Sequence, residues 1–130
     1  MIVVDASALL EVLLRTPAAA LVERFLFDPA QTLHAPHLID LEVAQVVRRY
    51  AASGEIGDGR AREALSDLAA LPLHRYPHDF LLQRVWELRN NFTAYDAVYV
   101  ALAEALDSPL LTRDRRLAGA AGHRARIELV

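Results

Sequence analysis

The sequence predicts one α/β domain with a parallel central sheet of four to five strands and helices on both faces. Short apolar runs alternate along the chain with longer segments of helical periodicity, a pattern typical of parallel sheets. The first run, Ile2–Val4, is apolar on successive residues, as expected of a strand buried on both faces. A length of 130 residues suits a single core, so we expect one domain over residues 1–130.

Capping residues and apolar periodicity set the boundaries of the predicted helices. Ser7, Asp58 and Thr93 are predicted as N-caps, and Pro17 suits a first helical turn. Gly54 provides a C′ stop for the helix before it. In chain order, the predicted helices cover residues 7–14, 17–27, 37–53, 58–71, 79–90, 94–106 and 115–120.

The predicted strands are short and lie between these helices. A weak strand is closed by Pro36, which has no amide hydrogen to donate. The helix over residues 94–106 is apolar almost all the way round and is therefore expected at the centre of the domain. In chain order, the predicted strands cover residues 2–4, 32–35, 73–76, 110–112 and 127–130.

Composition excludes several classes of site and partner. The chain has no cysteine, so disulfides, thiolate metal sites and cysteine nucleophiles are excluded. Its longest uncharged stretch is far shorter than the roughly 18 apolar residues of a membrane span, and its start lacks the sections of a signal peptide. We therefore expect a cytoplasmic protein. The net charge of −3 by itself argues against nucleic-acid binding. All 14 basic residues are arginine, which suits phosphate recognition, but a GC-rich genome would give the same bias.

Two carboxylates follow predicted strands at the same edge of the sheet. Asp5 comes directly after the first strand, and Asp114 follows the strand at residues 110–112 with one residue between. Ligands of open parallel sheets bind beyond the carboxyl ends of the strands, so the pair indicates a binding site. Each aspartate alone is equally explained as a helix cap or a turn former.

Glu42 and Asp96 are the third and fourth candidates. At about 100° per residue, Glu42 falls about 40° from Leu38, inside the apolar arc of its predicted helix. An ionised carboxylate there is costly unless a cation or a hydrogen-bond network meets it; pairing with Arg49 or an exposed edge is the alternative. Asp96 lies in the first turn of the central helix, where the helix dipole alone explains an acid, although this position also suits a carboxylate pointing into a cleft.

Four carboxylates in one pocket repel one another and need a compensating cation. Oxygen ligands favour Mg²⁺ or Mn²⁺, which retain waters and leave room for a substrate phosphate. The chemistry that follows is hydrolysis of a phosphodiester bond by a water of lowered pKa. The sequence contains no recognisable serine, cysteine or histidine catalytic apparatus.

Four short segments carry a family resemblance. Residues 2–9 are an apolar strand ending in Asp-x-Ser, residues 41–44 carry a helix-borne acid, residues 93–103 surround Asp96, and residues 112–117 read Thr-x-Asp-x-x-Leu. Each segment alone is a weak signal, but together they resemble the PIN-domain ribonucleases in order and spacing over essentially the whole chain. The closest resemblance is to the VapC-type toxins of toxin–antitoxin pairs.

The resemblance implies a PIN-like fold and a set of functional residues. Asp5, Glu42, Asp96 and Asp114 are implied as the catalytic, metal-binding acids, with Ser7 and Thr112 as polar support. Some relatives carry a further acid shortly after the last of these acids, and in this chain the position two residues on is Arg116. One tightly held ion, with a second arriving with the substrate, is consistent with that difference.

The resemblance also implies partners: a homodimer, endonucleolytic cleavage of RNA, with tRNA or rRNA as the expected class, and inhibition by a cognate VapB-type antitoxin. The cluster Arg113, Arg115 and Arg116 is a candidate for RNA phosphate contacts that position the strand without reading its sequence. A solvated helix start with surface arginines is an equal alternative for this cluster.

Three alternatives remain at this point. A haloacid-dehalogenase-like phosphotransfer enzyme needs an Asp-x-Asp loop, but here the second position is Ser7. A non-catalytic Mg²⁺-binding receiver-like signalling domain needs a late lysine, and this chain has none. A PIN fold that serves only as an interaction module is opposed by the presence of all four acids.

Overall fold

A five-stranded parallel sheet forms the centre of the protein. The computed structural model describes all residues, 1–130. The strand order is β3-β2-β1-β4-β5, and every neighbouring pair is parallel, which confirms the predicted α/β class. The strands are β1 (Ile2–Val4), β2 (Leu33–Pro36), β3 (Leu73–Tyr76), β4 (Leu110–Thr112) and β5 (Ile127–Leu129).

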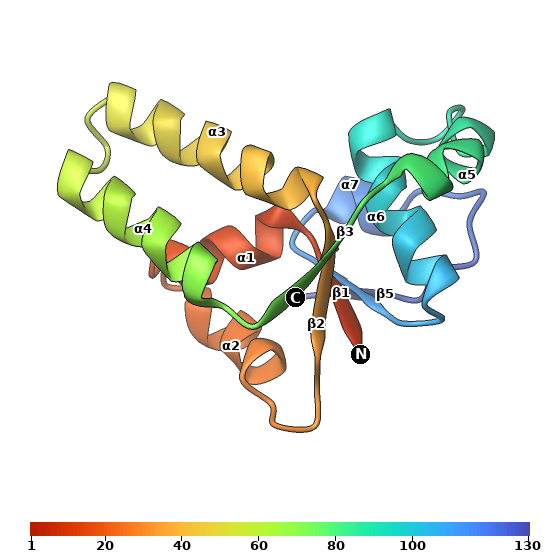
Figure 1. Cartoon of the computed structure of the whole chain (residues 1–130), viewed down its shortest axis with the longest axis horizontal. Helices are drawn as coiled ribbons and strands as arrows, with labels where there is room; N and C mark the ends of the chain where they lie inside the picture. Colours follow the sequence, from red (N-terminus) through yellow and green to blue (C-terminus); the bar gives the residue numbers. More distant parts are fainter.

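Helices cover the sheet on both sides. In Figure 1 α1, α2 and α4 lie on one side and α5 and α6 on the other, while α3 and α4 form a long hairpin. None of the helices is both long enough and apolar enough to cross a membrane. The helices are α1 (Ala6–Leu13), α2 (Ala19–Leu26), α3 (Leu38–Ala52), α4 (Asp58–Ala70), the 3-10 turn η1 (Asp79–Leu81), α5 (Leu82–Glu87), α6 (Ala94–Ala105) and α7 (Arg115–Ala118).

The most buried helix is α6, as its apolar sequence predicts. Seven consecutive residues from Ala97 to Ala103 are buried, and the helix packs against β1, β2 and β4. Thr93 is its N-cap and accepts a hydrogen bond from the amide of Asp96, as predicted. The first turn of α6 is therefore anchored to the sheet close to the ends of the central strands.

Two predicted N-caps are wrong by one or two residues. Asp5, not Ser7, caps α1, because the Asp5 carboxylate accepts from the amide of Ala8 and leaves the Ser7 hydroxyl free for other contacts. Gly57 is the N-cap of α4, and Asp58 is its first residue. In both cases the helix begins where the backbone turns, and a nearby polar side chain is a less reliable marker of that point.

Several other boundaries differ from the prediction by one to three residues, among them those of β2 and α5. Pro36 belongs to β2 and does not close it, because β1 pairs only with Leu33 and His34 and so requires no donor from Pro36. The segment predicted as one helix over residues 79–90 begins as a 3-10 turn and ends at Glu87. The α5–α6 turn, residues 88–93, then follows.

A buried ion pair joins α6 to α5 and to the segment before β5. The carboxylate of Glu104 has only 4% of its side chain exposed and accepts from Arg84 Nε at 2.7 Å and Nη2 at 3.0 Å. It also accepts from the amide of Arg124 at 2.8 Å. Burial opposes ionisation, but these donors and charges outweigh it and hold the pKa of Glu104 below its usual range.

Glu104→Gln is expected to lower the free energy of unfolding by about 2 kcal/mol at neutral pH, since it weakens a buried charge-assisted hydrogen bond. A lowered folded-state pKa means that the contribution of Glu104 is present above its ordinary pKa of 4.5 and is lost as the pH falls through the lower value. The difference from wild type in urea unfolding should therefore shrink near pH 3. Glu87→Gln removes the half-exposed partner of the same arginine and should cost less than about 0.5 kcal/mol.

Candidate active site

The carboxyl ends of β1 and β4 lie side by side at the point where the strand order changes direction. Val4 stands opposite Leu111 in the parallel register, and the amide of Asp5 donates to the carbonyl of Leu111 over 3.2 Å. Ligands of open α/β sheets bind at such a switch point. The polar residues that follow these two strands therefore meet across one edge of the sheet.

Asp5 is the most buried carboxylate at this edge, with 5% of the residue exposed. Its Oδ1 accepts from the Ser7 hydroxyl at 2.6 Å and from the amide of Ala8 at 3.0 Å. Its Oδ2 accepts from the Thr112 hydroxyl at 2.5 Å. Because a buried carboxylate without donors is costly, these three hydrogen bonds hold Asp5 in one orientation.

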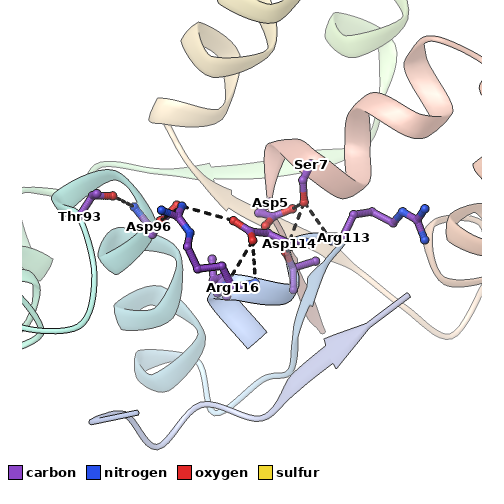
Figure 2. A network of polar contacts seen from close by, with 9 residues as sticks. Asp5, Ser7, Thr93, Asp96, Arg113, Asp114 and Arg116 are labelled. Carbon is purple, nitrogen blue, oxygen red and sulfur yellow. Dashed lines mark hydrogen bonds and ion pairs between the residues drawn. The ribbon is translucent and has the colours of Figure 1, made fainter. Parts of the chain in front are cut away.

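The hydroxyls of Ser7 and Thr112 connect Asp5 to the backbone that follows β4. The Ser7 hydroxyl accepts from the amide of Arg113 at 2.9 Å, and the Thr112 hydroxyl accepts from the amide of Asp114 at 2.9 Å. The two hydroxyl oxygens lie 3.3 Å apart. Figure 2 shows this network joining the end of β1 to the start of α7. The same bonds that orient Asp5 therefore also set the path of the chain toward Asp114.

Glu42 lies half-buried on α3 and accepts a hydrogen bond from the hydroxyl of Tyr99 on α6. It forms no ion pair with Arg49, the alternative considered from the sequence. The buried part of the carboxylate is instead compensated by this hydrogen bond. Burial, together with the charge of Glu42, raises the pKa of Tyr99 well above its usual range. Tyr99 therefore stays protonated and remains a donor to the carboxylate.

Asp96 and Asp114 both stand at helix starts, as their sequence positions suggest. Asp96 is in the first turn of α6 with 25% of its side chain exposed, so the carboxylate is partly accessible to solvent. Asp114 caps α7, with Oδ1 accepting from the amides of Arg116 at 2.9 Å and Leu117 at 3.3 Å. Its Oδ2 accepts from neither of these amides and lies 3.6 Å from the guanidinium of Arg116.

Arg116 supplies the positive charge between these two aspartates. Its Nη2 lies 3.2 Å from Asp96 Oδ2 and 3.6 Å from Asp114 Oδ2, and the side chain is 77% exposed (Figure 2). The other two arginines of the cluster behave differently. Arg113 turns toward Glu11 at 3.4 Å and donates to the carbonyl of Val130, while Arg115 is exposed on α7.

Burial and mutual repulsion make ionisation costly for the acids. Burial is the main cause that raises the pKa of Asp5, Glu42 and Asp96. Repulsion adds to it, because Asp114 raises the pKa of both Asp5 and Asp96, and Asp96 and Asp5 raise that of Glu42. The charge of Arg116 partly offsets this effect at Asp96. Each of the four carboxylates thus takes part in at least one of these repulsions.

The donor set fits a hard divalent cation in kind. It consists of carboxylate oxygens only. Glu42 keeps one oxygen outside its bond to Tyr99, and the charged partner of Asp114 Oδ2 is the exposed guanidinium of Arg116. No three acidic or histidine side chains are close enough in this structure to hold a metal ion together. Between Asp96 and Asp114 the cation present is Arg116, so a metal ion there would replace the guanidinium.

Two contacts of the site were not predicted from the sequence. Tyr99 was expected only as part of the apolar surface of the central helix, yet its hydroxyl meets Glu42 from three residues beyond Asp96. That spacing places both side chains on one helix face and is the signal that could have found it. Arg116 was considered as a phosphate contact, and no sequence pattern indicates its pairing with Asp96, 20 residues away.

The chain belongs to the PIN-domain family, whose family model matches residues 2–122. It is 49% identical over 129 residues to ribonuclease VapC1 of Mycobacterium tuberculosis, covering 98% of this chain and 96% of that protein. It is 44% identical over 130 residues to ribonuclease VapC12 of the same organism, covering 100% and 99%. This membership excludes the haloacid-dehalogenase and receiver-like alternatives.

Solved structures share the fold at low sequence identity. The M. tuberculosis toxin VapC20, described as cleaving the sarcin-ricin loop, superposes with a TM-score of 0.72 at 15% identity and covers 95% of this chain and 99% of its own. A chain from VapBC2 of Rickettsia felis, solved with a DNA fragment from its promoter, has a TM-score of 0.71 at 13% identity and covers 99% and 98%. At these identities the likeness supports the PIN fold alone.

Glu42→Gln is expected to raise the Tm of the protein in EDTA at pH 7. Burial raises the folded-state pKa of Glu42 above 4.5, so its ionisation favours unfolding as the pH rises through that range. The gain should shrink as the pH falls below 4.5, where the wild-type carboxyl is protonated in both states. The glutamine side chain can still accept a hydrogen bond from Tyr99, so wild type and variant differ mainly in the charge at this position.

Differential scanning calorimetry at two pH values tests this expectation, with Glu23→Gln on the exposed part of α2 as the matched control. Equal Tm values for Glu42→Gln and wild type at both pH values would contradict a burial cost at Glu42.

Proposed function

We propose that this protein is a divalent-metal-dependent endoribonuclease toxin of the VapC type. One observation carries the proposal. Four carboxylates from four separate elements lie close enough at the switch point of a PIN-domain sheet to oppose one another's ionisation. The ribonuclease names of relatives at 44% and 49% identity support the reaction class. A PIN fold used only as an interaction module has no need to maintain such repulsion.

In this proposal Asp5, Glu42, Asp96 and Asp114 hold Mg²⁺ or Mn²⁺. The bound cation supplies a water of lowered pKa and compensates the charge at the scissile phosphate. The three hydrogen bonds of Asp5 orient its carboxylate for metal binding before a cation arrives. Tyr99 orients Glu42 through its hydroxyl and keeps one carboxylate oxygen directed away from itself.

Arg116 is the arginine of the cluster best placed for an RNA phosphate. Its side chain is 77% exposed, and it can exchange its carboxylate partners for a phosphate that the substrate brings. Arg115 is exposed on the same helix and can contact a neighbouring phosphate. Arg113 is the weakest of the three candidates, since Glu11 and the carbonyl of Val130 already engage it.

We extend the proposal to the partners that the resemblance implies. A hollow of about 510 Å³ beside Glu42 is lined largely by apolar residues, and two of them, Leu41 and Tyr95, are 71% and 64% exposed. Large exposed apolar side chains favour a covering protein surface. A second copy of the chain and a VapB-type antitoxin are the proposed partners, and a cytoplasmic location follows from an RNA substrate.

The proposed substrate class is tRNA or rRNA. Mapping of new RNA 5′ ends after expression of the protein identifies the molecule that is cut.

Purified protein is expected to cleave RNA with Mg²⁺ or Mn²⁺ and to stop in EDTA. Asp5→Asn and Asp96→Asn should each lower the cleavage rate at least about 100-fold, since a lost ligand costs more than a lost supporting residue. Asp58→Asn, an exposed acid on α4, is the matched control and should leave the rate unchanged. Circular dichroism checks that each variant is folded, and full cleavage by both folded variants would overturn the proposed site.

Metal binding should also appear without any cleavage. A cation that binds only the folded state raises the free energy of unfolding by about 2.7 kcal/mol at 100 times its Kd. Wild type should therefore gain Tm on addition of Mn²⁺, whereas Asp5→Asn should gain little. A gain of equal size in wild type and in Asp5→Asn would place the binding elsewhere.

A further inference from the structure

A polar hollow of about 430 Å³ opens beside Asp96 and Arg116, and most of its lining residues are not among the four acids and their partners. The α5–α6 turn contributes Arg89, Asn90 and Asn91 to its lining, and all three side chains are exposed. Nothing in the proposed metal chemistry uses these residues. The hollow nevertheless shares Asp96 and Arg116 with the candidate centre, so a ligand in it lies next to the reacting groups.

The turn that carries these polar residues is held firmly. Leu88 and Phe92 flank them and are 2% and 7% exposed, so both ends of the polar run are anchored in the core. Asn91 packs against Gly122, where an added Cβ would lie 2.7 Å from Asn91 Nδ2. Gly122 also has a φ of +90°, which favours glycine. A backbone held in this way lowers the entropy cost of ordering its side chains when a ligand binds.

The lining chemistry matches a nucleotide. Arg89 and Arg116 come from two different elements and offer positive charge for phosphate. Asn90 offers an amide that both donates and accepts, as recognition of a base edge requires. The guanidinium of Arg89 lies over the ring of Trp86 at 4.4 Å from its centroid and donates to the carbonyl of Trp86 at 2.9 Å, so Trp86 holds this cation at the edge of the hollow.

We propose that this hollow is a subsite for one nucleotide of the RNA, directly beside the scissile phosphate. Arg89 contacts a phosphate, Asn90 contacts the base edge, and Arg116 lies between the subsite and the acids. The hollow beside Glu42 is lined largely by apolar residues and suits this role less well. The inference rests on the proposed ribonuclease function and adds a source of selectivity at one position of the cleaved sequence.

The test uses a pool of 5′-fluorescein-labelled RNA 12-mers with four central randomised positions. Asn90→Ala should flatten the base preference at one position next to the cut, by about 5-fold or more for a lost bidentate contact. Arg89→Ala should raise KM with little change in kcat. Arg24→Ala, which removes the same charge from the exposed surface of α2, is the matched control and should match wild type.

Binding gives a second readout that needs no cleavage. In the Asp5→Asn background, anisotropy of the same RNA should show a weaker Kd for Arg89→Ala and a salt slope smaller by about 0.7, the value for one phosphate contact to a single strand. Asn90→Ala should weaken binding without changing that slope. The fluorescence of Trp86, the single tryptophan, should respond to RNA and should lose its response in Arg89→Ala.

The two proposals fail in different ways. If wild type cleaves the pool while Arg89→Ala and Asn90→Ala behave like Arg24→Ala in KM, base preference and Kd, the subsite is overturned and the ribonuclease stands. If wild type cleaves nothing with Mg²⁺ or Mn²⁺, the ribonuclease proposal fails, and the anisotropy series decides the subsite. Binding that depends on Arg89 then supports it, and binding independent of Arg89, or no binding at all, overturns it.

Discussion

The hydrogen bonds of the buried Asp5 carboxylate are the constraint on which the rest of the site depends. β1 and β4 have three residues each, and their ladder ends where Asp5 begins. Beyond that point Ser7 and Thr112 continue the connection between the two strands through side chains. The backbone leaving β4 is therefore held close enough for Asp114 to begin α7 beside Asp5, and the position of Arg116 follows from the start of that helix.

The arrangement has a cost that a folded protein without this function would avoid. Burial and repulsion from neighbouring carboxylates raise the pKa of Asp5, Glu42 and Asp96. Their ionisation at neutral pH therefore opposes folding. The protein moderates the cost with neutral donors at Asp5 and Glu42 and with one exposed guanidinium between Asp96 and Asp114. Neutral donors orient a carboxylate without cancelling its charge, which keeps it suited to a cation. Such a balance between stability and site chemistry is common in enzymes.

Much of the fold could be predicted because local sequence and global topology agree. Apolar runs of strand length, the Thr93 cap and the apolar length of α6 all follow from local rules, and the parallel order follows from the alternation of elements. The prediction was wrong where two local rules competed. Ser7 and Asp5 are both good caps. Asp5 takes that role, and the Ser7 hydroxyl instead accepts from the amide of Arg113, the residue after β4.

By itself, the sequence determined the α/β class, the order of its elements and the placement of Asp5 and Asp114 at the same edge of the sheet. Tertiary structure alone decided which side chains meet across long separations. The bond from Tyr99 to Glu42 spans 57 residues, and the pair between Arg116 and Asp96 spans 20. The polar hollow likewise needs the α5–α6 turn and α7 side by side. Periodicity tells which face of a helix is buried, but it carries no information about which distant element that face will meet.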